Sequence, residues 1–433
     1  MLQAENNISD FNLSYLYKGP PLVVRYIAPL HNSRSENLFT TNNMKKVLLC
    51  LAFPLVLLTA VRGQNINPTN LNALLQKGKE TRSNAIIVYK DGKLYNSTYF
   101  DTVKAGTKIE TMSCTKSIVA LAVACLQADG LIDSLNVPVY KFYPEWKQGQ
   151  KQLITLNHLL TMTSGIQNNL NATVEIYPSL DFVQLALAAE LSSKPGEKWE
   201  YNNKALNLLA GIVKKVSGKR MDVYINNRLF KPLGIKNYGW TLDNAGNPNV
   251  MSGCQLKPAD FIKMGLLLLN KGNYNGVQVI PAKYVEGLTV PCKQYDGYGI
   301  LWWIDHESSV FVVDDDIINA MTTNAVAPDF IEKIKLIKGT YATELDFFNK
   351  VVGVFGPGWR QAMTGHLQAK KLHFFRKVNN GGISYRADGY LGNFIIVDPK
   401  TNIVAVRMIS SDRSTGDSTN FIEFKDMVLG LTK

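Results

Sequence analysis

Residues 111–130 read TMSCTKSIVALAVACLQADG, and this stretch decides the fold. Ser113 and Lys116 form the only Ser-x-x-Lys tetrapeptide in the chain. The residues after them are apolar on nearly every face and stop at Gly130, which predicts a buried helix over 113–129. At 3.6 residues per turn, Lys116 lies one turn from Ser113 on the same helix face.

A serine with a lysine one turn away is suited to nucleophilic catalysis. Ser113 is expected at the helix N-terminus, where backbone N–H groups and the helix dipole favour developing negative charge. The alternative is an N-cap serine followed by a surface lysine, but a lysine that enters a buried helix needs a partner. To act as a base, Lys116 requires a pKa lowered by desolvation or by nearby cations.

The N-terminal region predicts export. Residues 44–46 are Met-Lys-Lys, and residues 47–60 form an apolar run of 14. Val61-Arg62-Gly63 then places small residues at the positions that a signal peptidase reads. This order predicts a signal peptide over 44–63 and a periplasmic or secreted protein, a retained membrane anchor being the alternative. Residues 1–43 are polar and aperiodic, so we interpret them as a misannotated or disordered upstream segment. No second apolar run of membrane length follows, so we expect no stable membrane span in the mature chain.

Composition and net charge bear on the class of protein and on its partners. The 433 residues are 46% apolar and 19% charged, typical of a soluble globular protein. The net charge of +12 falls to +9 without the six basic and three acidic side chains of residues 1–63. A basic balance favours anionic surfaces, but no nucleic-acid motif accompanies the densest basic patch, residues 370–377. We therefore expect no nucleic-acid partner, and the oligomeric state is left open.

The cysteines do not define a metal site. Cys114 and Cys125 are eleven residues apart on one predicted helix and cannot pair. A disulfide between Cys254 and Cys292 remains open after export. The sequence contains no CxxC, no HExxH and no spaced His/Cys cluster. We expect neither a metal nor another cofactor.

Strand patterns occur near both ends of the chain and helical patterns between them. The predicted strands lie in residues 85–100, with a hairpin turn at Asp91-Gly92, and in 393–397 and 403–408, followed by a closing helix over 419–431. Helical signals fill residues 113–290. We predict an α/β (α+β) fold in which both chain ends build one antiparallel sheet flanked by helices, with a helical subdomain at about 117–290.

Residues 305–381 are a separate case. They lie between the strand-like segments 298–304 and 385–391, and they combine an Asp-Asp-Asp run with mixed helical signals. We interpret them as a mostly helical insertion over one rim of the sheet. A lid and a passive surface excursion are equally compatible with this pattern.

Further motifs follow Ser113-x-x-Lys116 in a fixed order. They are LLTMTSG at 159–165, Pro-Gly at 195–196, Tyr-x-Asn at 201–203, KPLG at 231–234 and YGILWW at 298–303. Together they resemble the class C β-lactamase-related serine hydrolases, which include D,D-peptidases, D-aminopeptidases, esterases and 6-aminohexanoate-dimer hydrolase. Trp240-Thr241-x-Asp243 and the YGILWW segment look most like the last branch. The resemblance covers about residues 85–408 apart from the insertion and implies a β-lactamase/transpeptidase-like fold for a hydrolase domain over 64–433.

The resemblance implies roles for individual residues. Ser113 would attack the acyl carbonyl and form an acyl-enzyme, with Lys116 and Tyr201 sharing the general-base work. Asn203 would hydrogen-bond Lys116 and the substrate. The oxyanion hole would consist of the backbone N–H groups of Ser113 and Tyr390. The substrate would be a small-molecule or peptide-like ester or amide.

The third family motif departs from the pattern. Relatives carry Lys-Thr-Gly or His-x-Gly on the strand beside the nucleophile, whereas Ala387-Asp388-Gly389 stands at that position here. Gly389 keeps the close backbone approach. The usual cation is missing and Asp388 brings a negative charge instead, while strand alternation points the neighbouring Arg386 away from Ala387. We expect a preference for neutral or cationic substrates over those that carry a carboxylate.

Aromatic residues are candidates for an acyl-binding surface. Trp302, Trp303 and Tyr390 are expected near the site, although neighbouring strand residues face opposite sides and one tryptophan is equally compatible with a core position.

Two other functions remain open. A true β-lactamase or D,D-peptidase would need its missing cation from the insertion, from Lys370, Lys371 or Arg376. A catalytically silent extracellular protein that binds peptides or cell-wall fragments is the second, although the joint presence of serine, lysine and tyrosine argues against it. A nucleophile-elbow hydrolase is excluded because the sequence has no G-x-S-x-G.

Overall fold

The computed structural model describes residues 65–101, 103–169, 171–370, 372–415 and 420–433. The predicted signal peptide and the segment before it lie outside these residues. Within the described part of the chain, no helix is both long and apolar enough to cross a membrane.

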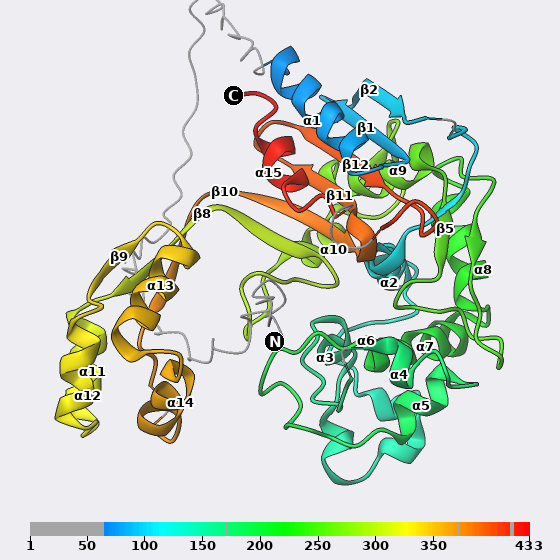
Figure 1. The fold of residues 1–433 in the computed structure, drawn as a ribbon. Helices are drawn as coiled ribbons and strands as arrows, with labels where there is room; N and C mark the ends of the chain where they lie inside the picture. Colours follow the sequence, from blue (N-terminus) through cyan, green and yellow to red (C-terminus); the bar gives the residue numbers. More distant parts are fainter. Residues whose placement is uncertain (1–64, 102, 170, 371, 416–419) are drawn as a thin grey trace, which may run out of the picture.

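A seven-stranded antiparallel sheet forms the centre of the described chain (Figure 1). Its strands, in spatial order, are β2 (Lys93–Tyr99), β1 (Ala85–Lys90), β12 (Ile403–Met408), β11 (Asn393–Asp398), β10 (Arg376–Gly389), β8 (Trp303–Val313) and β9 (Gly339–Tyr341). The two chain ends meet where β1 pairs with β12, in the register Ala85 opposite Met408. The prediction of one antiparallel sheet built from both ends is confirmed. Asp91 and Gly92 form its first hairpin turn, both with positive φ as a two-residue turn requires.

Helices cover both faces of this sheet. The face with Val404 and Val406 packs against α2 (Thr115–Ala128) and α9 (Pro258–Leu269) in the largest hydrophobic core. The alternate residues of the same strands pack against α1 (Pro68–Glu80) and α15 (Phe424–Leu429), which lie side by side. Because strand side chains alternate, β1, β11 and β12 are buried on both faces.

The segment between β2 and β8 contains α2, α9 and several shorter helices joined by long connections. Its remaining helices are α3 (Leu156–Leu160), α4 (Ala172–Glu175), α5 (Phe182–Ala188), α6 (Asn203–Leu206), α7 (Leu208–Ser217), α8 (Met221–Ile225) and α10 (Ala282–Glu286). Short strands form a small sheet of β3 (Ile109–Glu110), β5 (Cys254–Leu256) and β4 (Gly239–Trp240), and a hairpin of β6 (Asn273–Tyr274) and β7 (Val277–Gln278). This small sheet holds the chain just before the Ser-x-x-Lys segment.

The region predicted as an insertion is organised around two long strands. Residues 305–313 and 376–381 continue β8 and β10 and pair with each other, and the part between them leaves the sheet except at β9, which pairs with β8. That part contains α11 (Asp315–Thr323), α12 (Pro328–Lys335), α13 (Glu344–Phe355) and α14 (Trp359–Met363). It has its own hydrophobic core around Phe347. Figure 1 shows it at the far end of β8 and β10, away from α2.

Candidate active site

Ser113 lies in a 3-10 turn, Met112–Cys114, directly before α2. The regular helix therefore begins at Thr115, two residues later than the sequence predicts. Met112 has a φ of 49°, a left-handed conformation that is unfavourable for a methionine and that the surroundings must enforce. Thr111 provides part of this restraint, because its backbone N–H and its hydroxyl both donate to the Cys254 carbonyl, at 2.8 and 3.1 Å.

The Lys116 amine lies inside the protein and contacts the serine. Its Nζ donates to Ser113 Oγ at 2.9 Å and to the carbonyl oxygen of Met251 at 2.6 Å. The residue is only 2% exposed. Burial lowers the pKa of Lys116 from 10.5 to about 7, because an ammonium ion loses its hydration there. The expectation of a desolvated lysine beside Ser113 is confirmed.

The Met251 carbonyl was not anticipated from the sequence. It belongs to a loop held by Asn249, whose Oδ1 accepts the N–H groups of Met251 and Ser252 at 3.0 and 3.2 Å. Thr115 ties the same loop to α2 by donating to the Ser252 carbonyl at 2.5 Å. A backbone acceptor 135 residues away from Lys116 leaves no signature of residue type, so only the folded chain reveals it.

Tyr201 packs beside the amine. The Lys116 Nζ lies 5.0 Å from the centre of the Tyr201 ring. That ring stacks on Trp303, with the ring centres 6.2 Å apart and the ring planes at 15° to each other. Burial raises the pKa of Tyr201 above its usual value, and a side-chain interaction with Ser113 acts in the opposite direction. The phenol is therefore protonated at neutral pH.

Asn203 differs from the prediction. It begins α6, and among the described residues no donor reaches its buried Oδ1. The expected hydrogen bond from Lys116 to Asn203 is wrong in this structure, because the amine donates to the Met251 carbonyl instead. The next residue, Lys204, is a second buried lysine and pairs with Glu175 on α4. This pair was not anticipated from the sequence.

The end of β10 lies against the nucleophile turn. A Cβ atom on Gly389 would come within 2.7 Å of the Thr111 carbonyl and 3.2 Å of Cys114 Sγ, so no side chain fits there. Pairing between β10 and β8 stops at Arg386 opposite Trp303. The last residues of β10 thus extend beyond β8 beside Ser113.

Ala387 was expected to contact substrate, but its side chain is fully buried in the core that contains α2. The side-chain part of that expectation is wrong, because this position faces the inside of the sheet.

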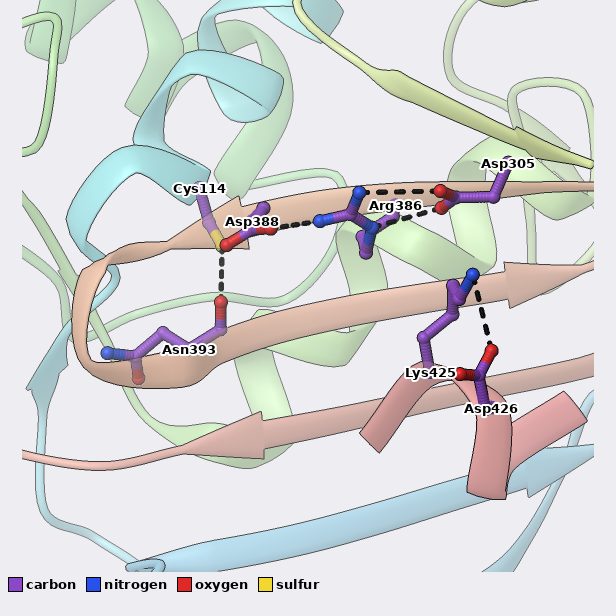
Figure 2. A network of polar contacts seen from close by, with 7 residues as sticks. All are labelled: Cys114, Asp305, Arg386, Asp388, Asn393, Lys425 and Asp426. Atoms are coloured by element: carbon purple, nitrogen blue, oxygen red, sulfur yellow. Dashed lines mark hydrogen bonds and ion pairs between the residues drawn. The ribbon is translucent and has the colours of Figure 1, made fainter. Parts of the chain in front are cut away.

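The sequence predicts no cation beside Asp388, but the Arg386 guanidinium lies there. Because alternate strand residues share a face, Arg386 lies on the same side as Asp388 and forms an ion pair with it (Figure 2). Its Nε and Nη2 also donate to Asp305, at 3.0 and 3.3 Å. Arg386 points away from Ala387, as predicted, but this orientation places it beside Asp388. The expectation that no cation opposes the charge of Asp388 is therefore wrong. Burial raises the pKa of Asp388, and Arg386 opposes that change.

Neither Lys370 nor Arg376, the two candidates of the insertion that the structure describes, lies at the third motif. Lys370 donates to the carbonyl of Asn324 at 2.8 Å, and Arg376 pairs with Asp314. Both contacts lie within the part of the chain around α11–α14, and Lys371 lies outside the described residues.

The aromatic candidates separate into core and surface. Trp302 is fully buried, so the expected contact of its side chain with substrate is wrong. Trp303 is half-buried and packs on Tyr298 at 5.0 Å, and the Arg386 guanidinium lies 5.2 Å from its ring centre. Tyr390 is 75% exposed, which leaves its ring free to meet a ligand.

All four cysteines of the described chain are free thiols, so Cys254 and Cys292 are not paired. Within the same residues, no group of His, Cys, Asp and Glu side chains is arranged to hold a metal ion.

Comparison with known proteins assigns the family. The family model described as Beta-lactamase matches residues 71–422. This chain belongs to the Beta-lactamase family. The resemblance inferred from the motifs is confirmed, and with it the β-lactamase/transpeptidase-like fold of serine hydrolases.

Sequence relatives in this family match only in part. Protein flp of Staphylococcus aureus (strain MRSA252) is 32% identical over 198 residues, which are 42% of this chain and 39% of that protein. PbpX of Bacillus subtilis (strain 168), described as a penicillin-binding protein, is 33% identical over 128 residues, 30% of this chain and 32% of that protein. The matched regions thus span less than half of these curated relatives.

Solved structures of β-lactamase-like proteins share the fold. A protein described as a 6-aminohexanoate-dimer hydrolase from Bacillus anthracis superposes with a TM-score of 0.59 at 16% identity, covering 83% of this chain and 81% of that one. A protein described as a β-lactamase from Bacteroides dorei DSM 17855 gives 0.57 at 15% identity, covering 85% and 99%. At this identity the likeness establishes the architecture.

The buried amine predicts a pH dependence for the reactivity of Ser113. Neutral Lys116 can accept the serine proton and the ammonium form cannot, so reactivity should rise with pH through about 7 and then level off. The rate of inactivation by an alkyl fluorophosphonate, followed from about pH 5 to pH 9, measures this. Lys116→Met should lose the inflexion. A wild-type rate that falls through neutral pH would contradict the assignment.

Proposed function

We propose that this chain is a serine hydrolase that cleaves an ester or amide bond through an acyl-enzyme on Ser113. The observation that carries the proposal is the 2.9 Å contact between Lys116 Nζ and Ser113 Oγ, made by an amine whose pKa burial lowers to about 7. A lysine in that state is available as a base at neutral pH.

Acylation would begin with proton transfer. Neutral Lys116 accepts the Ser113 hydroxyl proton while Oγ attacks the substrate carbonyl carbon. The carbonyl oxygen becomes an oxyanion, which the backbone N–H groups of Ser113 and Tyr390 would stabilise. The Met251 carbonyl accepts a hydrogen bond from the ammonium ion formed at Lys116. This contact limits the cost of holding that charge inside the protein.

Collapse of the intermediate would release the leaving group. The bond from the carbonyl carbon to the leaving oxygen or nitrogen breaks, and that atom takes a proton from the Tyr201 phenol, which Lys116 replenishes. A phenol with a raised pKa is protonated at neutral pH and is therefore ready to donate. Water then attacks the acyl-enzyme by the same proton transfers in reverse, which frees the acid and restores Ser113.

The substrate would lie along the end of β10. This strand extends past β8 after Arg386, and an extended ligand would meet the partly exposed Asp388 and the exposed Tyr390 there. Asn203 Oδ1 is a buried acceptor without a donor among the described residues, and it would accept an N–H group of the substrate. Trp303 and Tyr390 would flank the acyl group.

The charge of the site favours neutral or cationic substrates. Two carboxylates, Asp305 and Asp388, share the single guanidinium of Arg386. Asp388 is 35% exposed and Arg386 19%, so the carboxylate is the more accessible partner. A substrate carboxylate placed here would meet negative charge.

A β-lactamase or D,D-peptidase activity is the second candidate. Arg386 favours it, because a guanidinium near the third motif would bind a carboxylate if Asp388 were protonated, and burial raises the pKa of Asp388. No comparable observation favours a catalytically silent binding protein. The contact between Lys116 and the Ser113 hydroxyl is useful for deprotonating the serine and is not needed for binding alone. For location, we propose export to the periplasm or medium on the sequence pattern of residues 44–63.

Replacement of the nucleophile tests the reaction. Ser113→Ala should lose turnover of a short-chain p-nitrophenyl ester by about 10³-fold or more, because no acyl-enzyme forms. Absorbance of released p-nitrophenol measures this, beside a chromogenic cephalosporin. Ester turnover without cephalosporin turnover supports the esterase/amidase assignment, and strong cephalosporin turnover favours the second candidate. Equal turnover by the two proteins would overturn the proposed function.

Replacement of Asp388 tests the charge argument. Asp388→Ser leaves Arg386 paired with Asp305 alone, so kcat/KM for a carboxylate-bearing ester should rise about threefold to thirtyfold. A neutral ester of the same leaving group should change little, and Asp388→Asn, which keeps the side-chain shape, should behave like the serine variant. No gain on the anionic ester in either variant would contradict the argument.

A further inference from the structure

The turn that carries the Tyr390 N–H has an unfavourable backbone. Tyr390–Gly392 connects β10 to β11, and Leu391 has φ 68° and ψ 2°, a left-handed conformation in which its Cβ crowds the following carbonyl. Gly392 follows with φ 82°. Glycine adopts this conformation freely, whereas a left-handed leucine persists only where the surroundings hold it. The contacts that hold this turn therefore also restrain the position of the Tyr390 backbone at its start.

Arg407 on β12 supplies one set of these contacts. Its Nη1 donates to the Leu391 carbonyl at 2.9 Å and to the Gly392 carbonyl at 2.7 Å. Its Nη2 donates to the Thr81 carbonyl at 2.9 Å, and its Nε donates to Ser83 Oγ at 2.8 Å. The guanidinium thus joins the turn to the segment before β1.

This guanidinium reaches the turn from the face of the sheet opposite α2. Arg407 is fully buried and lies in register with Ile86 and Phe394, which belong to the core beneath α1 and α15. Gly392 is matched to it, because a Cβ atom there would collide with Arg407 Nη1. An arginine buried to this depth is costly unless its donors are used, and here several are.

Asn393 holds the other side of the same turn. Its Nδ2 donates to the carbonyls of Tyr390 and Ile409, both at 3.1 Å, and its Oδ1 accepts the Ile409 N–H at 3.0 Å. The Asn393 carbonyl accepts from Cys114 Sγ at 3.2 Å, which links the turn to the residue after the nucleophile (Figure 2). Three successive carbonyls, those of Tyr390, Leu391 and Gly392, are therefore each fixed by a buried side chain.

We infer that Arg407 and Asn393 are positioning residues for the reaction, because they hold the Tyr390–Gly392 turn so that the Tyr390 N–H faces the oxyanion. The inference rests on the proposed function. It assigns a kinetic role to a residue on the far face of the sheet that touches neither Ser113 nor the ligand. A purely structural role for the same arginine would affect how many molecules fold, and it would leave the rate of each folded molecule unchanged.

Variants of Arg407 separate the two roles. Arg407→Lys keeps the charge but cannot reach both carbonyls together with Thr81 and Ser83, and Arg407→Met removes every donor. Arg413→Met is the matched control, since Arg413 donates to the neighbouring Arg82 carbonyl and pairs with Asp101, away from the turn. For each full-length protein, kcat and KM for a p-nitrophenyl ester are measured per active site by titration. The inhibition constant of phenylboronic acid, whose tetrahedral adduct on serine presents an oxygen to the oxyanion hole, is measured alongside.

We expect kcat per site to fall about tenfold to hundredfold in Arg407→Met, and less in Arg407→Lys, with KM nearly unchanged. Boronate affinity should fall by the same factor, and Arg413→Met should keep both values. If Arg407→Met does not fold, Arg407→Lys carries the test. A folded Arg407→Lys protein with kcat per site and boronate affinity within about twofold of wild type overturns the inference. Wild-type turnover that does not depend on Ser113 instead overturns the proposed function, and the inference with it.

Discussion

The burial of one amine is the constraint on which this structure depends. Lys116 enters a helix whose other residues are almost all apolar, so its ammonium form has little hydration to rely on. Two oxygen atoms, Ser113 Oγ and the Met251 carbonyl oxygen, accept hydrogen bonds from this amine in place of water. The first is the group that the reaction must deprotonate. The second comes from a loop that Asn249 shapes and that Thr115 ties back to the same helix.

The sheet explains why this helix meets a strand end. Its central strands are β1, β12, β11 and β10, so strands from the two ends of the chain lie side by side in the middle of the sheet. The C-terminal end of β10 packs so closely on the nucleophile turn that only a glycine, Gly389, fits there. The next strand, β11, then runs back beneath α1 and α15. The site therefore has contacts on both faces of the sheet: α2 and Lys116 on one, and Arg407 on the other. This makes its geometry a property of the whole sheet and not of the cleft alone.

Local patterns predicted much of this arrangement. The strand patterns in residues 85–100 and 393–408 predicted the strands, and the Ser113-x-x-Lys116 spacing on an apolar helix predicted the contact between Ser113 and a buried Lys116. The features that the sequence did not predict are contacts between distant segments of the chain or contacts made by a long side chain. The Met251 carbonyl and the Arg407 guanidinium meet their partners only after folding. Arg386 was within reach of the same alternation rule, which places it beside Asp388, two residues on.

The central claim is that the Lys116 amine is neutral near physiological pH, and direct titration tests it most simply. The protein is labelled with lysine carrying ¹³C at Cε, and its resonances are followed across pH. The signal of Lys116 is identified by its absence in Lys116→Met. The account predicts that this resonance titrates at about 7, while exposed lysines titrate near 10.5. A Lys116 resonance that titrates together with the exposed lysines would contradict it.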